Sequence, residues 1–289
     1  MRDSAILLDK PKGLTSQEAV TLVKRTVGVP KAGHTGTLDP IATGLLIICT
    51  GECTKVARFL SDLPKEYLAT LKLGERTDTL DAEGKVIERA EATIEKDQLR
   101  EILKKFTGKI KQIPPMYSAL KYEGKPLYKL ARKGIVVERE EREVEVYSLV
   151  LLDLSPPYAK LLINCEKGTY IRTLADDIGH EAGTLAHLAE LRRTKIGPFK
   201  IENAATLDEL PFPDKLKPGA VLSIDEALSF MQEIHLDAIA SKKAKNGAPV
   251  RVNEDFTGYV RMKDEKGNLF AIGNAFKGIL KVERGLNLD

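Results

Sequence analysis

The sequence predicts an α+β protein whose strands form a largely antiparallel sheet. Residues 66–74 alternate apolar and polar side chains as a half-buried strand does, with Tyr67 on the apolar face. Residues 94–107 instead place Leu99 and Ile102 at the spacing of an amphipathic helix. Strand-like and helix-like segments then follow one another without the regular alternation that a parallel α/β sheet requires.

The N-terminal part of the chain carries clear local signals. Residues 5–8 form a short apolar run that predicts a buried strand. Thr15 and Glu18 have the spacing of a capping box, so a helix should begin there, and Gly28 is suited to end it. The apolar run 44–51 fits either a buried strand or a short buried helix, because periodicity does not separate the two.

The remaining elements suggest two domains. Strands are expected at 143–154 and 158–166, a helix at 170–183 and a short helix at 221–232. Three short strands separated by turn residues follow in the tail. The expected division is a first domain of residues 1–232 and a small β-rich domain of residues 233–289.

Composition excludes several protein classes. Of the 289 residues, 43% are hydrophobic and 30% charged, as in ordinary soluble proteins. No apolar run approaches the roughly 18 residues of a membrane span, and the N-terminus lacks a secretory signal, so a cytoplasmic protein is expected. The three cysteines have no partner cluster of cysteine or histidine, which favours buried free thiols over a metal site.

A basic segment stands out from the rest of the chain. Residues 104–133 hold nine lysines and arginines against one glutamate, a net charge of +8 in a chain whose total is +3. Tyrosines lie between these cations, and glycines and prolines break the segment into short pieces. The pattern favours contact with nucleic-acid phosphates. The alternative is the solvated helical face that lysine runs usually form.

The stretch 33–46, "GHTGTLDPIATGLL", contains a single carboxylate, Asp39. Glycines on both sides permit close approach of another chain, and Pro40 restricts Asp39 to extended conformations. The acid should therefore lie on a stiff, approachable loop. The alternative is that Asp39 merely caps the turn that follows it, as aspartate often does. The sequence contains no Walker A, dinucleotide-binding, zinc-protease or serine-hydrolase motif.

Six ordered motifs give the sequence a family resemblance. Over about residues 5–200 the chain resembles the TruB family of pseudouridine synthases, which convert one uridine of the tRNA T-loop, conventionally position 55, to pseudouridine. The motifs are "LDKPKGLTS", "AGHTGTLDPIATGLL", "KEYLATLKLGERTDTLDAEG", "PPMYSALKYEGKPLYKLARKG", "KGTYIRTLADDIG" and "LAELRRTKIGPF". The resemblance implies a pseudouridine-synthase catalytic domain followed by a small PUA-like RNA-binding domain.

The resemblance also implies an active site. Asp39 would be the catalytic aspartate, Tyr67 the tyrosine that stacks on the target base, and Arg172 the arginine that pairs with the aspartate. Leu191 would line the uracil pocket. From their local context alone, Tyr67 and Leu191 could equally be core side chains, and Arg172 could form a surface salt bridge.

Further residues would contact RNA by the same resemblance. His34 would fill the space left by the extruded uridine, and Asp81 would help to hold RNA near the site. Lys10 would contact phosphate or brace its loop. Without RNA contact, His34 would be a structural histidine, Asp81 a turn-forming aspartate and Lys10 a solvated lysine. The T-arm would be gripped by an insertion at about residues 104–134 that includes the lysines Lys121, Lys125 and Lys129.

The reaction that the resemblance implies detaches uracil, turns it and reattaches it through C5. It requires neither a redox step nor phosphate transfer, so no cofactor and no metal are expected. The insertion is typical of the stand-alone bacterial branch, which implies a monomer that acts on tRNA without a protein partner. The alternatives are a guide-RNA-dependent synthase subunit and a tRNA-folding protein without catalysis.

Overall fold

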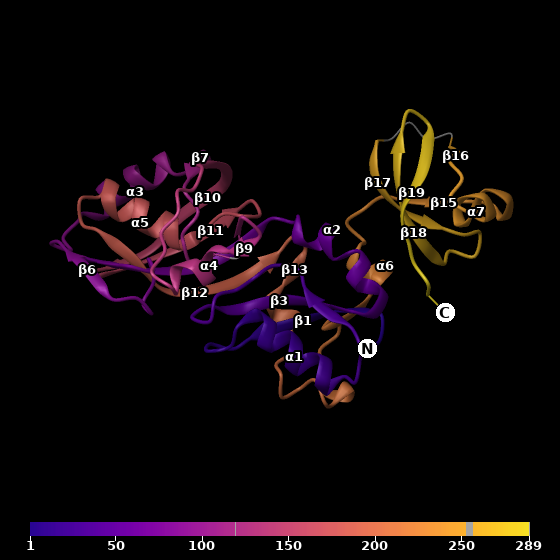
Figure 1. Ribbon diagram of the computed structural model, residues 1–289, viewed down its shortest axis with the longest axis horizontal. Helices are drawn as coiled ribbons and strands as arrows, with labels where there is room; N and C mark the ends of the chain where they lie inside the picture. The colour runs from indigo at the N-terminus through magenta and orange to yellow at the C-terminus, as the bar shows by residue number, and fades with distance from the viewer. Residues whose placement is uncertain (119, 253–256, 289) are drawn as a thin grey trace.

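The computed structural model describes residues 1–118, 120–252 and 257–288, and it confirms the α+β class (Figure 1). A large sheet forms the main body, and a smaller curled sheet forms the C-terminal part. In the view of Figure 1, the C-terminal sheet stands at one end of an elongated molecule. Among the described residues, no helix combines the length and the apolar character that a membrane crossing needs.

The main sheet is antiparallel at every strand pair except one. Its strand order is β14–β1–β3–β12–β4–β11–β10–β7, with β2 paired to β3 and β13 to β12; only β3 and β12 run parallel. The strands are β1 (Ser4–Lys10), β2 (Ala32–His34), β3 (Thr43–Thr50), β4 (Lys65–Leu73), β7 (Gly108–Gln112), β10 (Arg142–Ser155), β11 (Tyr158–Cys165), β12 (Ala186–Ile196), β13 (Phe199–Lys200) and β14 (Val221–Ser223).

The central strand β4 shows why one face of this sheet becomes the core. Its odd-numbered residues from Tyr67 to Leu73 are buried, whereas Leu68 on the opposite face is 40% exposed. Successive side chains of a strand point to opposite faces, so the alternation in the sequence fixes which face is buried. The run at 44–51 is strand β3, which decides the choice that periodicity left open.

Three helices pack their apolar sides into the same core cluster as β4. Helix α1 (Ser16–Thr26) begins at the expected capping box, in which Thr15 and Glu18 bond to each other's backbone. Helix α3 (Lys96–Lys105) buries Leu99 and its neighbours, and helix α5 (Ile171–Glu181) is buried along most of its length. A short helix α2 (Ala57–Ser61) follows β3.

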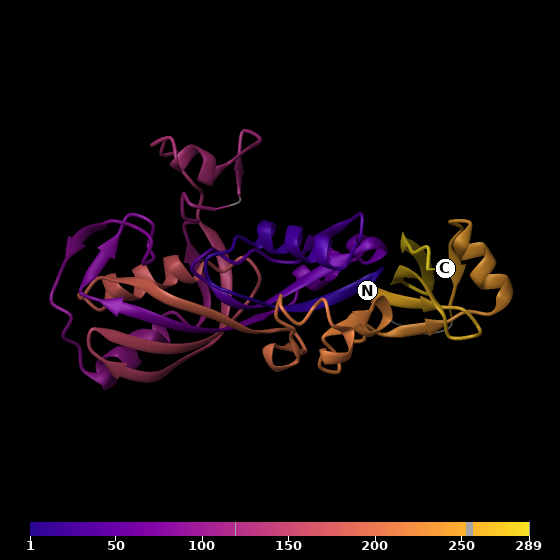
Figure 2. The ribbon, with the colours of Figure 1, turned by 90° about the horizontal axis from the view of Figure 1, so that it is seen from below.

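The basic segment is broken into short elements, as the sequence predicted. After β7 the chain forms a hairpin of β8 (Lys121–Tyr122) and β9 (Lys125–Pro126) and then the short helix α4 (Leu127–Ala131). Figure 2 shows the hairpin and α4 projecting from the main body. A second hairpin, of β5 (Glu75–Thr77) and β6 (Val86–Arg89), lies after β4.

The expected helix at 221–232 is wrong for most of its length. Residues Val221–Ser223 form strand β14 on the edge of the main sheet, and only Ile224–Ala227 are helical, as α6. A capping box at Ser223 starts α6, so the local signal was genuine. Pairing with β1 extends the sheet instead of the helix, because a tertiary contact outweighed the weak helical propensity.

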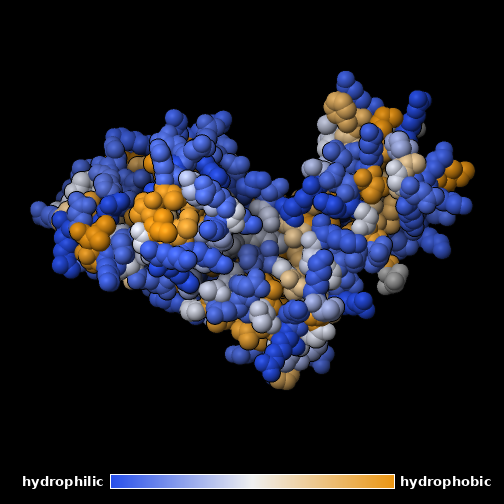
Figure 3. Space-filling view, viewed as in Figure 1, coloured by the Kyte–Doolittle hydropathy of each residue, from blue (hydrophilic) through white to orange (hydrophobic). Residues whose placement is uncertain are grey.

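The C-terminal sheet has the order β15–β17–β18–β19–β16. Its elements are β15 (Glu233–His235), helix α7 (Ala238–Lys245), β16 (Val250–Arg251), β17 (Gly258–Lys263), β18 (Leu269–Phe276) and β19 (Ile279–Gly285). The three predicted tail strands are therefore confirmed as β17, β18 and β19. Leu269, Ile272 and Leu286 pack into one apolar cluster with residues of β1 and β3, so the small sheet is anchored to the main body. The space-filling view shows a mostly hydrophilic surface with a notch between the two parts (Figure 3).

Candidate active site

A cavity of about 330 Å³ lies on the main body. Its walls come from the loop after β2, the end of α2, the start of β4, the segment of the insertion between β7 and β8, the turn before α5, and β12. The lining includes Asp39, Tyr67, Ser118, Arg172 and Leu191. The fold thus brings together the four residues that the sequence placed at the centre of the site.

Asp39 lies on the loop between β2 and β3, and this loop is held by hydrogen bonds at several points. The Ser16 hydroxyl donates to the Leu38 carbonyl at 2.9 Å and accepts from the Leu38 amide at 2.8 Å. The Asp39 carbonyl accepts from the Ala42 amide at 3.0 Å. The Asp39 side chain is 36% exposed and forms its ion pair across the cavity, with Arg172. The stiff loop that the sequence predicted is therefore observed.

Arg172 connects Asp39 to two other parts of the protein. From the first turn of α5, its Nε lies 3.0 Å from Asp39 Oδ2, and its Nη1 lies 3.2 Å from Asp81 Oδ2. Its Nη2 donates to the Tyr117 carbonyl at 2.7 Å. Only 5% of Arg172 is exposed, so the surface-salt-bridge interpretation is wrong. A planar guanidinium with several donors can bind all three partners at once.

The environment of Asp39 shifts its proton affinity in two directions. Burial raises the pKa of this carboxyl above its ordinary value and is the largest effect. The Arg172 guanidinium opposes that rise, the negative charge of Asp81 adds to it, and the Lys10 ammonium also lowers the pKa. The two cations therefore oppose the effect of burial and favour the ionised form of Asp39.

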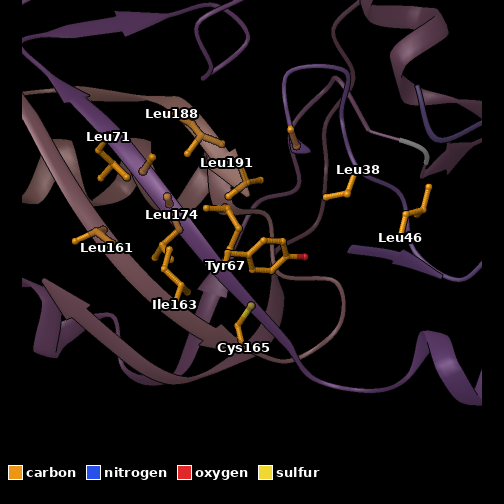
Figure 4. Packing of buried hydrophobic residues seen from close by; sticks show 14 of the residues in the cluster. Leu38, Leu46, Tyr67, Leu71, Leu161, Ile163, Cys165, Leu174, Leu188 and Leu191 are labelled. Atoms are coloured by element: carbon orange, nitrogen blue, oxygen red, sulfur yellow. The ribbon is translucent and has the colours of Figure 1, made fainter. Parts of the chain in front are cut away.

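Tyr67 and Leu191 form apolar walls of the cavity. Each is 8% exposed, and both belong to the main core cluster. Figure 4 shows the Tyr67 ring near Leu191 and Cys165, with its hydroxyl directed toward the side on which Leu38 lies. Burial raises the pKa of the Tyr67 phenol, and the Arg193 guanidinium opposes the rise. Both residues are core side chains and cavity walls at once.

Asp81 and Lys10 are both buried beside the cavity. Asp81 is 3% exposed and accepts hydrogen bonds from the Thr79 hydroxyl at 2.6 Å and the Glu83 amide at 3.1 Å, besides its ion pair with Arg172. Lys10 is fully buried and donates to the carbonyls of Pro11 and Leu14, at 2.9 and 2.7 Å. Burial lowers the pKa of Lys10 to about 8. These contacts fit the loop-bracing alternative for Lys10 better than a phosphate contact.

The other expected RNA contacts lie outside the cavity lining. His34 is half-buried on β2, where burial lowers the pKa of its imidazole. Lys121, Lys125 and Lys129 are exposed on the hairpin and on α4, and no ion pair of theirs occurs within the described part of the chain. By contrast, Lys109 of the same basic segment pairs with Glu143 at 2.9 Å, so part of its charge is neutralised locally.

Sequence reasoning missed Arg193, which lines the same cavity. It is 1% exposed, and its guanidinium donates to the carbonyls of Leu45 and Gly36 at 2.7 and 3.1 Å, which clamps the Asp39 loop against β12. A Cβ atom at Gly44 would lie 2.3 Å from the Arg193 carbonyl oxygen, so the strands meet there only because the residue is glycine. The sequence holds no local signal that separates Arg193 from the other charged residues of this strand.

Lys65 also lines the cavity and was not singled out. It is 7% exposed, and its ammonium donates to the Leu63 carbonyl at 2.6 Å. Burial lowers the pKa of Lys65 to about 8, and the Arg193 charge acts in the same direction. All three cysteines are free and buried, as predicted. Within the described ranges, no group of three or more metal-ligating side chains is placed to hold an ion.

Comparisons with known proteins agree with the resemblance. The family model "TruB family pseudouridylate synthase (N terminal domain)" matches residues 24–171, and "tRNA pseudouridylate synthase B C-terminal domain" matches residues 172–212. The tRNA pseudouridine synthase B of Haemophilus influenzae is 44% identical over 96% of this chain and 89% of its own length. That of Ectopseudomonas mendocina is 47% identical over 94% of this chain and 90% of its own length.

Solved structures share the fold. An archaeal box H/ACA sRNP Nop10-Cbf5 complex matches with a TM-score of 0.73 and 26% identity, covering 98% of this chain and 86% of that one. A Cbf5-Nop10-Gar1 complex matches with a TM-score of 0.75 and 27% identity, covering 100% of this chain and 84% of that one. The chain therefore shares its fold with proteins solved in Nop10-Cbf5 and Cbf5-Nop10-Gar1 complexes.

Proposed function

The chain belongs to the TruB family of pseudouridylate synthases, and from this premise we propose that it isomerises uridine 55 in the T-loop of tRNA to pseudouridine. The relatives at 44% and 47% identity carry the name tRNA pseudouridine synthase B, which supports tRNA as the substrate. The observation that carries the proposal is the Asp39 carboxylate, 3.0 Å from Arg172 in a cavity that Tyr67 and Leu191 also line.

Asp39 is the proposed catalytic residue. An ionised carboxylate can attack C1′ of the ribose or C6 of the base, or it can assist loss of uracil and deprotonation at C2′. Each route needs a charged, oriented oxygen beside the glycosidic bond. The pairing of Arg172 with Asp39 provides both the charge and the orientation, because a nearby cation favours the ionised acid. None of these routes uses a cofactor.

The cavity suits a single base better than a duplex. A volume of about 330 Å³ accommodates one nucleobase with its sugar, so the target uridine must leave its stack to enter. Tyr67 would lie against the extruded base, and Leu191 would bound the pocket on its apolar side. His34, at the end of β2 where the Asp39 loop begins, is proposed to occupy the space that the uridine vacates in the RNA.

The rest of the molecule is proposed to hold the T-arm. The insertion spans about residues 104–134, and its exposed residues Lys121, Lys125 and Lys129 can contact phosphates, because duplex RNA is bound mainly through its shape and backbone. Residues 233–289 would form the PUA-like RNA-binding domain, and residues 1–232 the catalytic domain. The small sheet of β15 to β19 begins at Glu233, which supports this limit.

We expect the chain to act as a monomer in the cytoplasm, without a guide RNA or a protein partner. The insertion, which presents its own basic surface, supports that view. The competing function is that of a guide-dependent subunit, because the solved structures of the same fold are complexes with Nop10 and, in one case, Gar1. A tRNA-folding protein in which Asp39 has no catalytic part is the second alternative.

A tritium-release assay tests these functions together. The purified chain alone is incubated with an unmodified T-arm hairpin labelled at C5 of the target uridine. We expect turnover by the native chain, a loss of at least about a thousandfold for Asp39→Asn, and normal rates for Asp97→Asn, whose side chain is 91% exposed on α3. Normal turnover by Asp39→Asn would overturn the catalytic assignment, and activity that needs added RNA or protein would favour the guide-dependent alternative.

A further inference from the structure

Two buried hydroxyl groups in the cavity lack hydrogen-bond partners. Thr35 is 3% exposed and Ser118 is 5% exposed, and both line the cavity. Neither Thr35 Oγ1 nor Ser118 Oγ forms a hydrogen bond with any residue that the structure describes. A buried hydroxyl without a protein partner costs about 1–3 kcal/mol, so one on the wall of a cavity is a candidate contact for a ligand.

Ser118 is held in place from two directions. The preceding residue, Tyr117, is fixed by Arg172, whose Nη2 donates to the Tyr117 carbonyl at 2.7 Å. The carbonyl of Ser118 itself accepts from the amide of Tyr128 in α4, at 3.1 Å. The backbone around Ser118, which is part of the insertion, is thus held by the arginine of the site and by α4. A donor fixed in this way is pre-organised for a ligand.

The Tyr170 phenol is the side chain that could act as a hydrogen-bond partner of the Ser118 hydroxyl. Burial raises the pKa of Tyr170, and a hydrogen-bonding interaction of its phenol with the Ser118 side chain opposes the rise. They do not, however, meet in a hydrogen bond of ordinary geometry. Ser118 Oγ is thus a buried donor without a hydrogen-bond partner of ordinary geometry among the described residues, on a residue that lines the cavity.

We propose that Ser118 binds the substrate by donating a hydrogen bond from Oγ to a carbonyl oxygen of the extruded uracil. The inference rests on the proposed function and deepens it. Enzymes that flip a base read it by hydrogen bonds to its Watson–Crick edge and by contacts with its faces. Tyr67 and Leu191 supply apolar contacts, whereas Ser118 is a neutral donor that suits an uncharged carbonyl. Because Ser118 is bonded to α4, the insertion that grips RNA would also position this contact.

Comparing two forms of the enzyme on three substrates tests the proposed hydrogen bond between Ser118 and the uracil. Native chain and Ser118→Ala are compared on T-arm hairpins that carry uridine, 2-thiouridine or 4-thiouridine at the target position, using tritium release from C5. A thione accepts hydrogen bonds poorly, so replacing the contacted oxygen should remove the effect of the mutation. We expect Ser118→Ala to lower kcat/KM about three- to tenfold on uridine, and less than twofold on one of the two thiouridines.

A matched control separates this effect from a general disturbance. Thr173→Val removes another buried hydroxyl that has no partner among the described residues; it lies on α5, outside the cavity lining. On each of the three substrates, kcat/KM of this variant should stay within about twofold of the native value. Equal losses for Ser118→Ala on all three substrates, or no loss on uridine, would overturn the inference. Inactivity of the native chain would instead refute the proposed function, so the two failures are distinguishable.

Discussion

The ion pair between Arg172 and Asp39 makes a quantitative prediction about the pH dependence of the reaction. Only the ionised form of Asp39 is active in the proposed mechanism, so activity falls as the pH drops through the pKa of this acid. The Arg172 guanidinium lowers that pKa, hence Arg172→Met should raise it and move the acid limb of kcat/KM to higher pH. The negative charge of Asp81 acts in the opposite sense, so Asp81→Asn should move the limb to lower pH.

The size of the displacement follows from geometry. A cation in contact with a carboxylate typically changes its titration by one to three units. Nε and Oδ2 lie 3.0 Å apart, but the Asp39 side chain keeps 36% exposure, so water screens the pair and the lower end applies. We therefore expect the acid limb of Arg172→Met to lie at higher pH than that of the native enzyme, with a smaller displacement than a fully buried pair would give.

The assay is tritium release measured across the acid limb for the native chain, Arg172→Met and Arg172→Lys. The lysine variant keeps the charge and should move the limb less. Arg172→Met leaves the buried Asp81 without its cation, which costs stability of the order of 3–5 kcal/mol, so the double variant Arg172→Met/Asp81→Asn is the folded control. An acid limb that stays in place in Arg172→Met, with turnover still measurable, would refute the electrostatic argument.

Two further predictions concern binding and stability. Replacing the exposed lysines Lys121, Lys125 and Lys129 of the insertion by glutamine should weaken T-arm binding. The slope of the logarithm of the binding constant against the logarithm of the salt concentration should become smaller by about two. Lys109→Gln, at a lysine already paired with a glutamate, is the control, and an unchanged slope in the triple variant would exclude phosphate contact. Gly44→Ala should lower the free energy of unfolding by about 3 kcal/mol in urea titrations, because its Cβ would lie 2.3 Å from a carbonyl oxygen of β12 at a φ of +102°. Gly33→Ala, where nothing lies within 4 Å, should be tolerated, and equal stability of the two variants would contradict the packing argument.

Local patterns predicted most elements of the fold. The alternation around Tyr67 gave β4, the capping box at Thr15 gave α1, and the spacing of Leu99 and its neighbours gave α3. The segment 221–232 shows where this reasoning fails, since its first residues pair with β1. Helix α7 was not expected, because its lysine-rich sequence has a weak apolar periodicity.

Some residues of the candidate site were likewise predicted from the sequence, and others were not. The glycine–proline context of Asp39 predicted a stiff loop, and the family motifs pointed to Tyr67, Arg172 and Leu191, which line one cavity. Arg193 escaped notice because nothing in its neighbours along the chain reveals that its guanidinium is buried against the Asp39 loop. That burial depends on β3 and β12 lying side by side.

The sequence by itself determined the local elements, the family and the chemical groups at hand, because periodicity, caps and turn residues act between neighbours in the chain. Only the tertiary structure decided that Arg172 contacts Asp39, Asp81 and Tyr117 together, and that Ser118 Oγ lacks a partner among the described residues. The physical reason is that desolvation and charge pairing depend on which distant segments exclude water around a group. Sheet pairing and core packing set those neighbours, and no short stretch of residues records them.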